Sequence, residues 1–97
     1  MRIELLFFEG CPHVPQTRER LRALLVEAQL PPTWTEHDLR ASSSPDWVRA
    51  YGSPTVLVDG NDVAAGAPSA ALSCRVYANS DVKGVPAVDD IRAALRR

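Results

Sequence analysis

Two cysteines, Cys11 and Cys74, carry the most distinctive chemistry of this 97-residue chain. Cys11 lies in the stretch Phe8-Glu9-Gly10-Cys11-Pro12-His13, where an apolar run ends and a helical pattern begins. A strand that delivers a cysteine to the start of a helix places its thiol beside backbone N–H groups and the positive end of the helix dipole. Such a position predicts nucleophilic thiol chemistry at Cys11, and the alternative for Cys11 is a small buried apolar residue.

The neighbours of Cys11 set how reactive its thiol is expected to be. His13 is a candidate acid–base partner because imidazole titrates near neutrality, and the alternative for it is a solvent-facing residue near a helix start. Pro15 disfavours helical backbone at Val14, so we expect the helix to begin near Pro15 and to leave Cys11 one turn outside it. Glu9 adds a nearby negative charge. Together these residues predict only moderate activation of Cys11.

The elements that must position Cys11 alternate between strand and helix patterns. Ile3 to Phe8 is almost continuously apolar and predicts a buried central strand. Apolar residues at helical spacing follow, up to an end near Leu30 that Pro31-Pro32 enforces. The later predictions are a strand over 33–39, a short helix over 46–50 capped by Ser44, strands over 55–58 and 61–65, and a last helix containing Val88, Ile91 and Leu95.

Residues 66–84 form a stretch of nineteen residues without a clear helix or strand pattern, which is uncommon in a compact domain and often functional. In its middle, Leu72, Cys74 and Val76 alternate with Ser73, Arg75 and Tyr77. One interpretation of Cys74 is an inert cysteine that faces the core. The other follows from topology: the strands on either side of Asp59-Gly60 return the chain to the edge that carries Cys11. We therefore predict that both cysteines lie at one end of the molecule.

Composition limits the function classes. The hydrophobic fraction of 45% and the charged fraction of 24% are typical of one globular domain. A net charge of -1 from 11 basic and 12 acidic residues gives no electrostatic footprint for nucleic acid. Glu4 interrupts the first apolar run, so we expect neither a signal peptide nor a membrane span, and a cytoplasmic location by default. Cytoplasmic cysteines are normally reduced, so a bond between Cys11 and Cys74 would be catalytic or redox-sensing.

The order of these elements, with Cys11 at the first strand-to-helix junction and Ser53-Pro54-Thr55 opening the third strand, resembles the thioredoxin-like superfamily in its short, glutaredoxin-sized form. Within it the chain looks closest to small bacterial proteins with a Gly-Cys-Pro start, some of which are labelled alkylmercury-lyase-like. The resemblance implies one β-α-β-α-β-β-α domain over residues 1–97. It also implies a mixed four-stranded sheet with helices on both faces, and residues 66–84 form an insertion near the active-site edge.

The resemblance also implies roles for individual residues. Cys11-Pro12-His13 is similar to the start of the Cys-Pro-His-Cys motif of periplasmic disulfide oxidants, but Val14 stands where that motif has its second cysteine. Pro54 matches the cis-proline of the superfamily, and Ser53 before it would present backbone groups to an extended substrate. Pro12 and Arg75 are further candidate substrate-binding residues, although an exposed arginine needs no function.

Three functions remain open on this basis. The first is a thiol-dependent oxidoreductase or thiol-transfer protein in which Cys11 attacks a disulfide and Cys74 or an external thiol resolves the product. The second is a soft-metal binder that holds Hg(II) or a similar ion between Cys11 and Cys74, the only hypothesis here with a metal or cofactor. The third is a binding module without chemistry. The expected partner is a thiol or disulfide, as a protein or a small molecule, rather than nucleic acid or a membrane.

Overall fold

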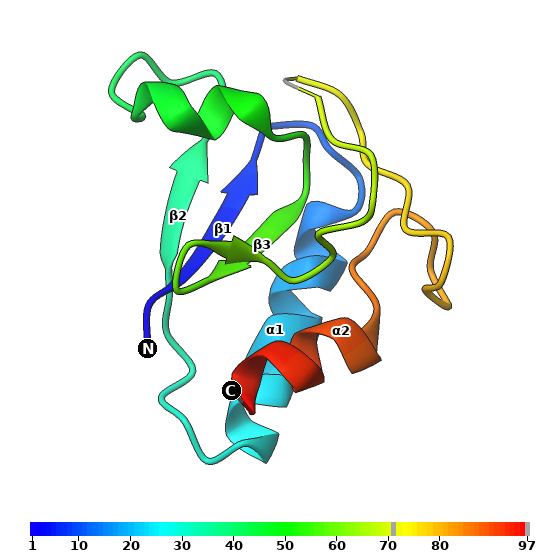
Figure 1. The fold of residues 1–97 in the computed structure, drawn as a ribbon. Coiled ribbons are helices and arrows are strands. Elements are labelled where there is room, and N and C mark those ends of the chain that lie inside the picture. The colour runs from blue at the N-terminus through cyan, green and yellow to red at the C-terminus, as the bar shows by residue number, and fades with distance from the viewer. Residues whose placement is uncertain (71, 97) are drawn as a thin grey trace.

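A four-stranded mixed sheet forms the centre of the fold (Figure 1). Its strands are β1 (Ile3–Phe7), β2 (Thr35–Asp38), β3 (Thr55–Val58) and β4 (Asn61–Asp62), in the order β2-β1-β3-β4. β1 runs parallel to β2 and antiparallel to β3, and β4 is antiparallel to β3. The computed structural model describes residues 1–70 and 72–96. The predicted α/β class, the mixed four-stranded sheet and the central place of the first strand are confirmed.

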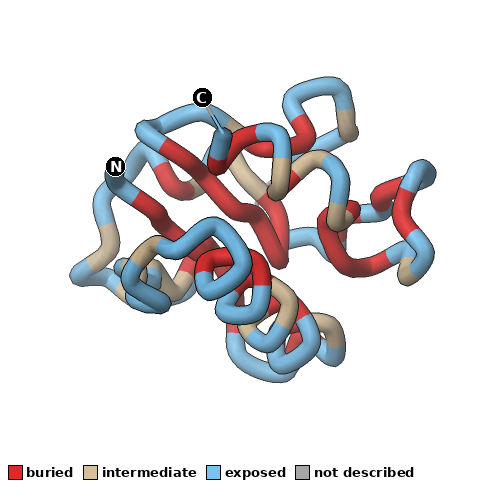
Figure 2. Tube along the Cα trace, turned by 90° about the horizontal axis from the view of Figure 1, so that it is seen from below, coloured by how far each residue is buried: buried red, intermediate tan, exposed pale blue. Residues whose placement is uncertain are grey.

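The two α-helices cover the same face of the sheet. Side chains of α1 (Val14–Glu27) and α2 (Val88–Leu95) share one apolar cluster with β1 and β3, which includes Ile3, Leu5, Leu21, Leu25, Val56, Val58, Ile91 and Leu95. A second cluster joins Leu6 and Leu57 to Val48 of the 3-10 helix η1 (Asp46–Ala50) on the other face. Figure 2 shows the buried positions running along the strands and the inner sides of the helices. The prediction of helices on both faces is thus confirmed only in part: among the described residues, the second face carries the short 3-10 helix η1 and no α-helix.

The end of α1 differs from the prediction. The helix stops at Glu27, before Leu30, and the two prolines lie beyond its end. Gln29 takes a left-handed backbone with φ of 59°, its N–H donates to Val26 O at 3.0 Å, and the Leu30 N–H donates to Leu25 O at 2.9 Å. This pair of bonds is a Schellman closure, which satisfies the last carbonyl groups of the helix. A glutamine occupies the position where glycine is usual, so the sequence pattern did not reveal it.

The predicted cap of the second helix is also wrong. Pro45, rather than Ser44, is the residue before η1, and no side-chain cap bond forms there. The Ser44 hydroxyl instead donates to the Asp38 carbonyl at 2.6 Å, which fastens this loop to the end of β2. The returning strand is shorter than predicted as well, since β4 ends at Asp62.

Glu4, the polar interruption in β1, is buried on the sheet. Its carboxylate lies 2.9 Å from His37 Nε2 and 3.1 Å from Arg2 Nε. A buried carboxylate requires such partners because it loses its hydration. His37, for which the sequence shows no partner, therefore has a structural role beside β1.

The described residues of the 66–84 segment form no helix or strand beyond a one-residue bridge between Ser53 and Cys74. The segment leaves β4, passes the start of β3 and returns to α2 beside α1 (Figure 1). On the return, Arg20 of α1 donates to the Pro86 carbonyl at 3.0 Å and pairs with Asp81. None of the helices in the described part of the chain combines the length and apolarity needed to cross a membrane.

Replacement of Leu21, which is fully buried between α1 and the sheet, tests this core. We expect Leu21→Ala to lower the free energy of unfolding by about 2–5 kcal/mol, because the truncated side chain leaves a cavity. Val26→Ala on the same helix is the control, since Val26 is 60% exposed and should cost less than about 0.5 kcal/mol. Urea denaturation followed by circular dichroism measures both, and equal losses would contradict the packing described here.

Candidate functional site

Cys11 lies in a pair of turns between β1 and α1. Its N–H donates to Phe8 O and its carbonyl accepts from the Val14 N–H, each at 3.3 Å. Gly10 has a φ of +88°, a conformation that suits glycine. Because α1 begins at Val14, one residue earlier than predicted, Cys11 still lies one turn outside the helix as expected. The residue is 5% exposed and packs in the second apolar cluster.

Cys74 reaches the same end of the molecule through Ser53. The Ser53 N–H donates to Ser73 O at 2.8 Å, and the Arg75 N–H donates to Ser53 O at 2.9 Å. The Ser53 hydroxyl in turn accepts from the N–H of Phe8 at 3.4 Å. Cys74 is therefore tied to the end of β1 from which Cys11 follows. The prediction that the two cysteines share one end of the molecule is confirmed.

The two thiols interact with each other, although both cysteines are free. Partial burial raises the pKa of the Cys74 thiol, and the neighbouring Cys11 thiol raises it further. A second thiolate nearby disfavours ionisation because like charges repel. A disulfide bond between them would need their Cα atoms within about 7 Å.

Arg75 anchors the segment that carries Cys74. Its side chain is fully buried, and its guanidinium lies 2.7 Å from the Asp62 carboxylate. All five of its N–H groups have acceptors within the chain, namely Asp62, the Thr55 hydroxyl and the carbonyl groups of Ala64, Ala67 and Pro68. A guanidinium that is engaged in this way has no donor left for a substrate. In this structure Arg75 fixes the segment instead of presenting a charge to solvent.

In this segment the larger polar side chains are buried and the aliphatic side chains are exposed, which is the reverse of the usual arrangement. Arg75 and Tyr77 point inward and are 2% and 1% exposed, whereas Leu72, Cys74 and Val76 face solvent. Tyr77 stacks under the Arg75 guanidinium carbon at 4.9 Å, and its hydroxyl donates to the Pro54 carbonyl. Burial raises the pKa of that hydroxyl. The interpretation of Cys74 as a residue facing the core is therefore wrong.

Two glycines, for which the sequence predicts no role at the site, allow the segment to approach. A Cβ on Gly52 would lie 2.6 Å from Ser73 O and 2.9 Å from Ala70 O, both backbone atoms. A Cβ on Gly84 would collide with the His13 imidazole. Neither glycine lies in a sequence pattern that points to a site, because each contact joins residues distant along the chain.

The other predicted site residues have these positions. Ser53-Pro54 is a cis peptide bond, as the resemblance implies, and both residues are buried. The Ser53 backbone groups expected to meet a substrate are taken by Ser73 and Arg75. Pro12 is exposed, and the half-buried ring of His13 packs on Gly84. The acid–base role of His13 stays a prediction.

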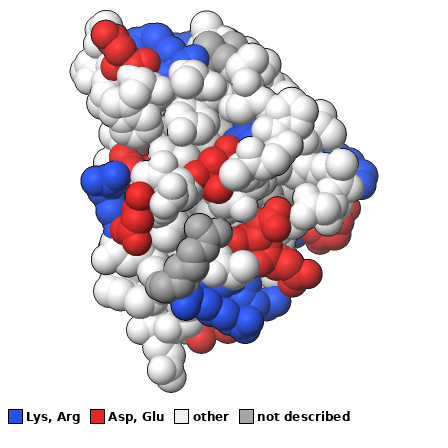
Figure 3. All heavy atoms as spheres, in the orientation of Figure 1, with Lys and Arg blue, Asp and Glu red and all other residues white. Residues whose placement is uncertain are grey.

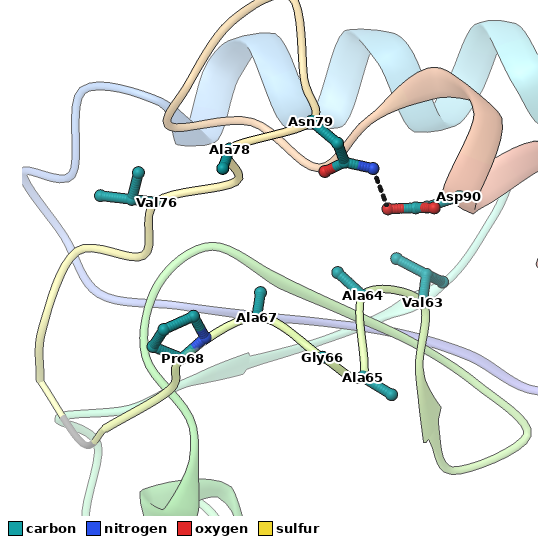
Figure 4. Close-up of a pocket in the computed structure, with 10 residues that line it drawn as sticks. All are labelled: Val63, Ala64, Ala65, Gly66, Ala67, Pro68, Val76, Ala78, Asn79 and Asp90. Carbon is teal, nitrogen blue, oxygen red and sulfur yellow. Dashed lines mark hydrogen bonds between the residues drawn. The ribbon is translucent and has the colours of Figure 1, made fainter.

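Two hollows flank this region. One of about 270 Å³ lies between the start of α1 and the end of β1, where Cys11, Glu9 and Arg18 line it. A larger one of about 390 Å³ separates residues 63–68 from residues 76–79, with Asn79 and Asp90 hydrogen-bonded at one end (Figure 4). Neither cysteine lines the larger hollow, so the thiol chemistry is centred elsewhere. On the face in Figure 3, acidic and basic side chains are interspersed.

Metal ligands are few at this site. Across residues 1–70 and 72–96, no three His, Cys, Asp or Glu side chains are grouped in a way that could hold an ion. A soft ion would therefore depend on the two thiols as its protein ligands.

Comparison of the chain with protein-family models, curated proteins and solved structures finds no match. Arguments about its function therefore rest on the residues and geometry of this site.

Replacement of Gly52 tests how the segment is seated. Gly52→Ala should push Ser73 and Ala70 away, because the new methyl group meets backbone atoms that cannot rotate aside. We expect amide exchange at Ser53 and Arg75 to accelerate about ten-fold or more. Gly66→Ala is the control, since a Cβ there meets nothing within 4 Å. Equal exchange rates in the two variants, measured by NMR, would show that the segment does not depend on this contact.

The interaction between the thiols predicts a pH effect. The alkylation rate of Cys74 should reach its midpoint above the pH expected for an ordinary thiol, because its pKa is raised. Cys11→Ser should move that midpoint to lower pH without abolishing the shift, since partial burial is the larger cause. Iodoacetamide labelling of residue 74, followed by mass spectrometry across pH, measures both profiles. An unchanged midpoint in Cys11→Ser would contradict thiol contact.

Proposed function

We propose that this protein is a thiol–disulfide oxidoreductase whose working group is a reversible Cys11–Cys74 disulfide. The observation that carries the proposal is that two free cysteines from distant parts of the chain meet at one end of the sheet, where Ser53 bridges to Cys74 and bonds to Phe8, three residues before Cys11. The chain fixes the segment of Cys74 there with a fully buried arginine. The proposed location is the cytoplasm, where thiols are kept reduced. There a Cys11–Cys74 bond would form transiently, during turnover.

The fold supports this proposal. We infer that the domain is thioredoxin-like, with β1 parallel to β2, antiparallel β3 and β4, and the reactive cysteine after β1. The cis bond at Ser53-Pro54 opens β3 beside the cysteines, which agrees with that inference. In this arrangement Cys74 supplies the second thiol that Val14 does not.

The chemistry needs no further group from the protein. One thiolate attacks a sulfur of a substrate disulfide, which forms a mixed disulfide and releases one substrate thiolate that takes up a proton. The second protein thiolate then attacks the protein sulfur of the mixed disulfide, forms the Cys11–Cys74 bond and releases the other substrate thiol. The substrate disulfide gains two electrons and the protein dithiol loses two. Two molecules of an external thiol reverse the sequence: they reduce the Cys11–Cys74 bond in two exchange steps and become a disulfide themselves.

The paired thiols favour one second candidate. Two thiolates side by side are suitable ligands for a soft ion such as Hg(II), and Cys11 and Cys74 would be those ligands. The hypothesis requires stoichiometric binding that either single Cys→Ser variant loses. Binding of this kind without disulfide turnover would favour it over redox chemistry.

Mild oxidation tests the proposed function. We expect reduced protein treated with oxidised glutathione to lose two hydrogens and become monomeric disulfide protein, because the partner thiol is within the same chain. Mass spectrometry after tryptic digestion should link residues 3–18 to residues 50–75, the peptides that contain the cysteines. Cys11→Ser and Cys74→Ser should each fail to form the bond. Intermolecular dimers as the sole product in the unmodified protein would contradict the proposal.

A further inference from the structure

The two cysteines differ sharply in their access to solvent. Cys74 is exposed on the outer side of the 66–84 segment, whereas Cys11 is 5% exposed within an apolar cluster. Attack on a disulfide requires the thiolate to approach in line with the S–S bond. The rate therefore depends on the access of the thiol to solvent as well as on its thiolate fraction. A disulfide with groups on both sulfurs can meet Cys74 much more readily than Cys11.

Cys11 is covered by its neighbours in the second apolar cluster, among them Phe8, Val14 and Tyr51, and the segment that carries Cys74 is firmly held. Residues 73–75 bond to Ser53 on either side of Cys74, Arg75 is bonded at all five donors, and Gly52 permits backbone contact. Cys11 itself lines the small hollow beside Glu9 and Arg18 and is only 5% exposed. The structure therefore opposes the order in which Cys11 reacts first.

The surroundings of Cys74 suit the first reaction. Leu72 and Val76, the residues two positions before and after it, are 53% and 61% exposed, so a mixed disulfide at Cys74 would extend into solvent. The raised pKa of Cys74 lowers its thiolate fraction at neutral pH. Intrinsic nucleophilicity rises with thiol pKa, which offsets part of that loss.

We propose that Cys74 is the thiol that attacks the substrate disulfide and that Cys11 is the resolving thiol. This order rests on the proposed function and reverses the roles predicted from the sequence. Cys74 thiolate attacks one sulfur of the disulfide, forms a mixed disulfide and releases a thiolate that becomes protonated. Cys11 thiolate then attacks Cys74 Sγ, so the mixed bond breaks, the Cys11–Cys74 bond forms and the second substrate thiol leaves. Cys11 needs no solvent access for this step because its target is the adjacent sulfur.

Oxidised glutathione is the probe for the order, because its two tripeptide arms cannot enter the small hollow beside Cys11 readily. At pH 8 we expect Cys11→Ser to form a stable mixed disulfide at residue 74. The rate of this step should be no lower than the rate at which the unmodified protein forms its first mixed disulfide. Cys74→Ser should react with glutathione disulfide at least about ten-fold more slowly than the unmodified protein. Mass spectrometry of quenched samples gives both rates, and thermal melting checks that the variants stay folded.

A second measurement avoids mutation. Acid quenching of the unmodified protein early in the reaction should give glutathione on the 50–75 peptide and not on the 3–18 peptide. Early adducts on the 3–18 peptide, together with fast reaction of Cys74→Ser, would overturn the order while leaving the proposed function intact. If no Cys11–Cys74 bond forms in the unmodified protein under any disulfide, the proposed function itself fails.

Discussion

The buried pair of Arg75 and Asp62 is the interaction on which the site depends. A guanidinium taken out of water is tolerated only when its charge and all its donors are matched, and here one carboxylate, one hydroxyl and three carbonyl groups match them. Removal of one partner from such a pair typically costs about 3–5 kcal/mol. The pair thereby gives a definite position to a segment that has no helix or strand of its own.

That position has a chemical consequence. Arg75 and its neighbour Tyr77 take the inward side of the segment, so the residues between and beside them, including Cys74, must face outward. The same anchoring draws Ser73 and Arg75 onto the Ser53 backbone and places Cys74 over the end of β1. One arginine therefore turns Cys74 outward, whereas Cys11 is buried among its neighbours in the second apolar cluster. The contrast in access between the two thiols, and with it the proposed order of reaction, originates in this packing.

Much of the fold was predictable because its determinants are local. The apolar run of β1, the Asp59-Gly60 turn and the acidic first turn of α2 each act within a few residues. The two wrong predictions, the end of α1 and the cap of η1, also have local reasons. Gln29 adopts a left-handed conformation that usually belongs to glycine, and Ser44 bonds to Asp38 instead of capping η1. The one-sided placement of α1 and α2 was not predictable, since periodicity reveals that a face is buried but not which side of the sheet covers it.

The sequence by itself determined which atoms could react: a cysteine after the first strand, no second cysteine at Val14, and one more in a long irregular segment. It also predicted that the two would lie at one end, because strand directions decide where the chain returns. Only the tertiary structure decided which thiol faces solvent. Alternation in a short segment defines two sides but not which side is buried. Here the side of Arg75 is buried because its guanidinium bonds to Asp62, Thr55 and three carbonyl groups, which come together only in the folded chain.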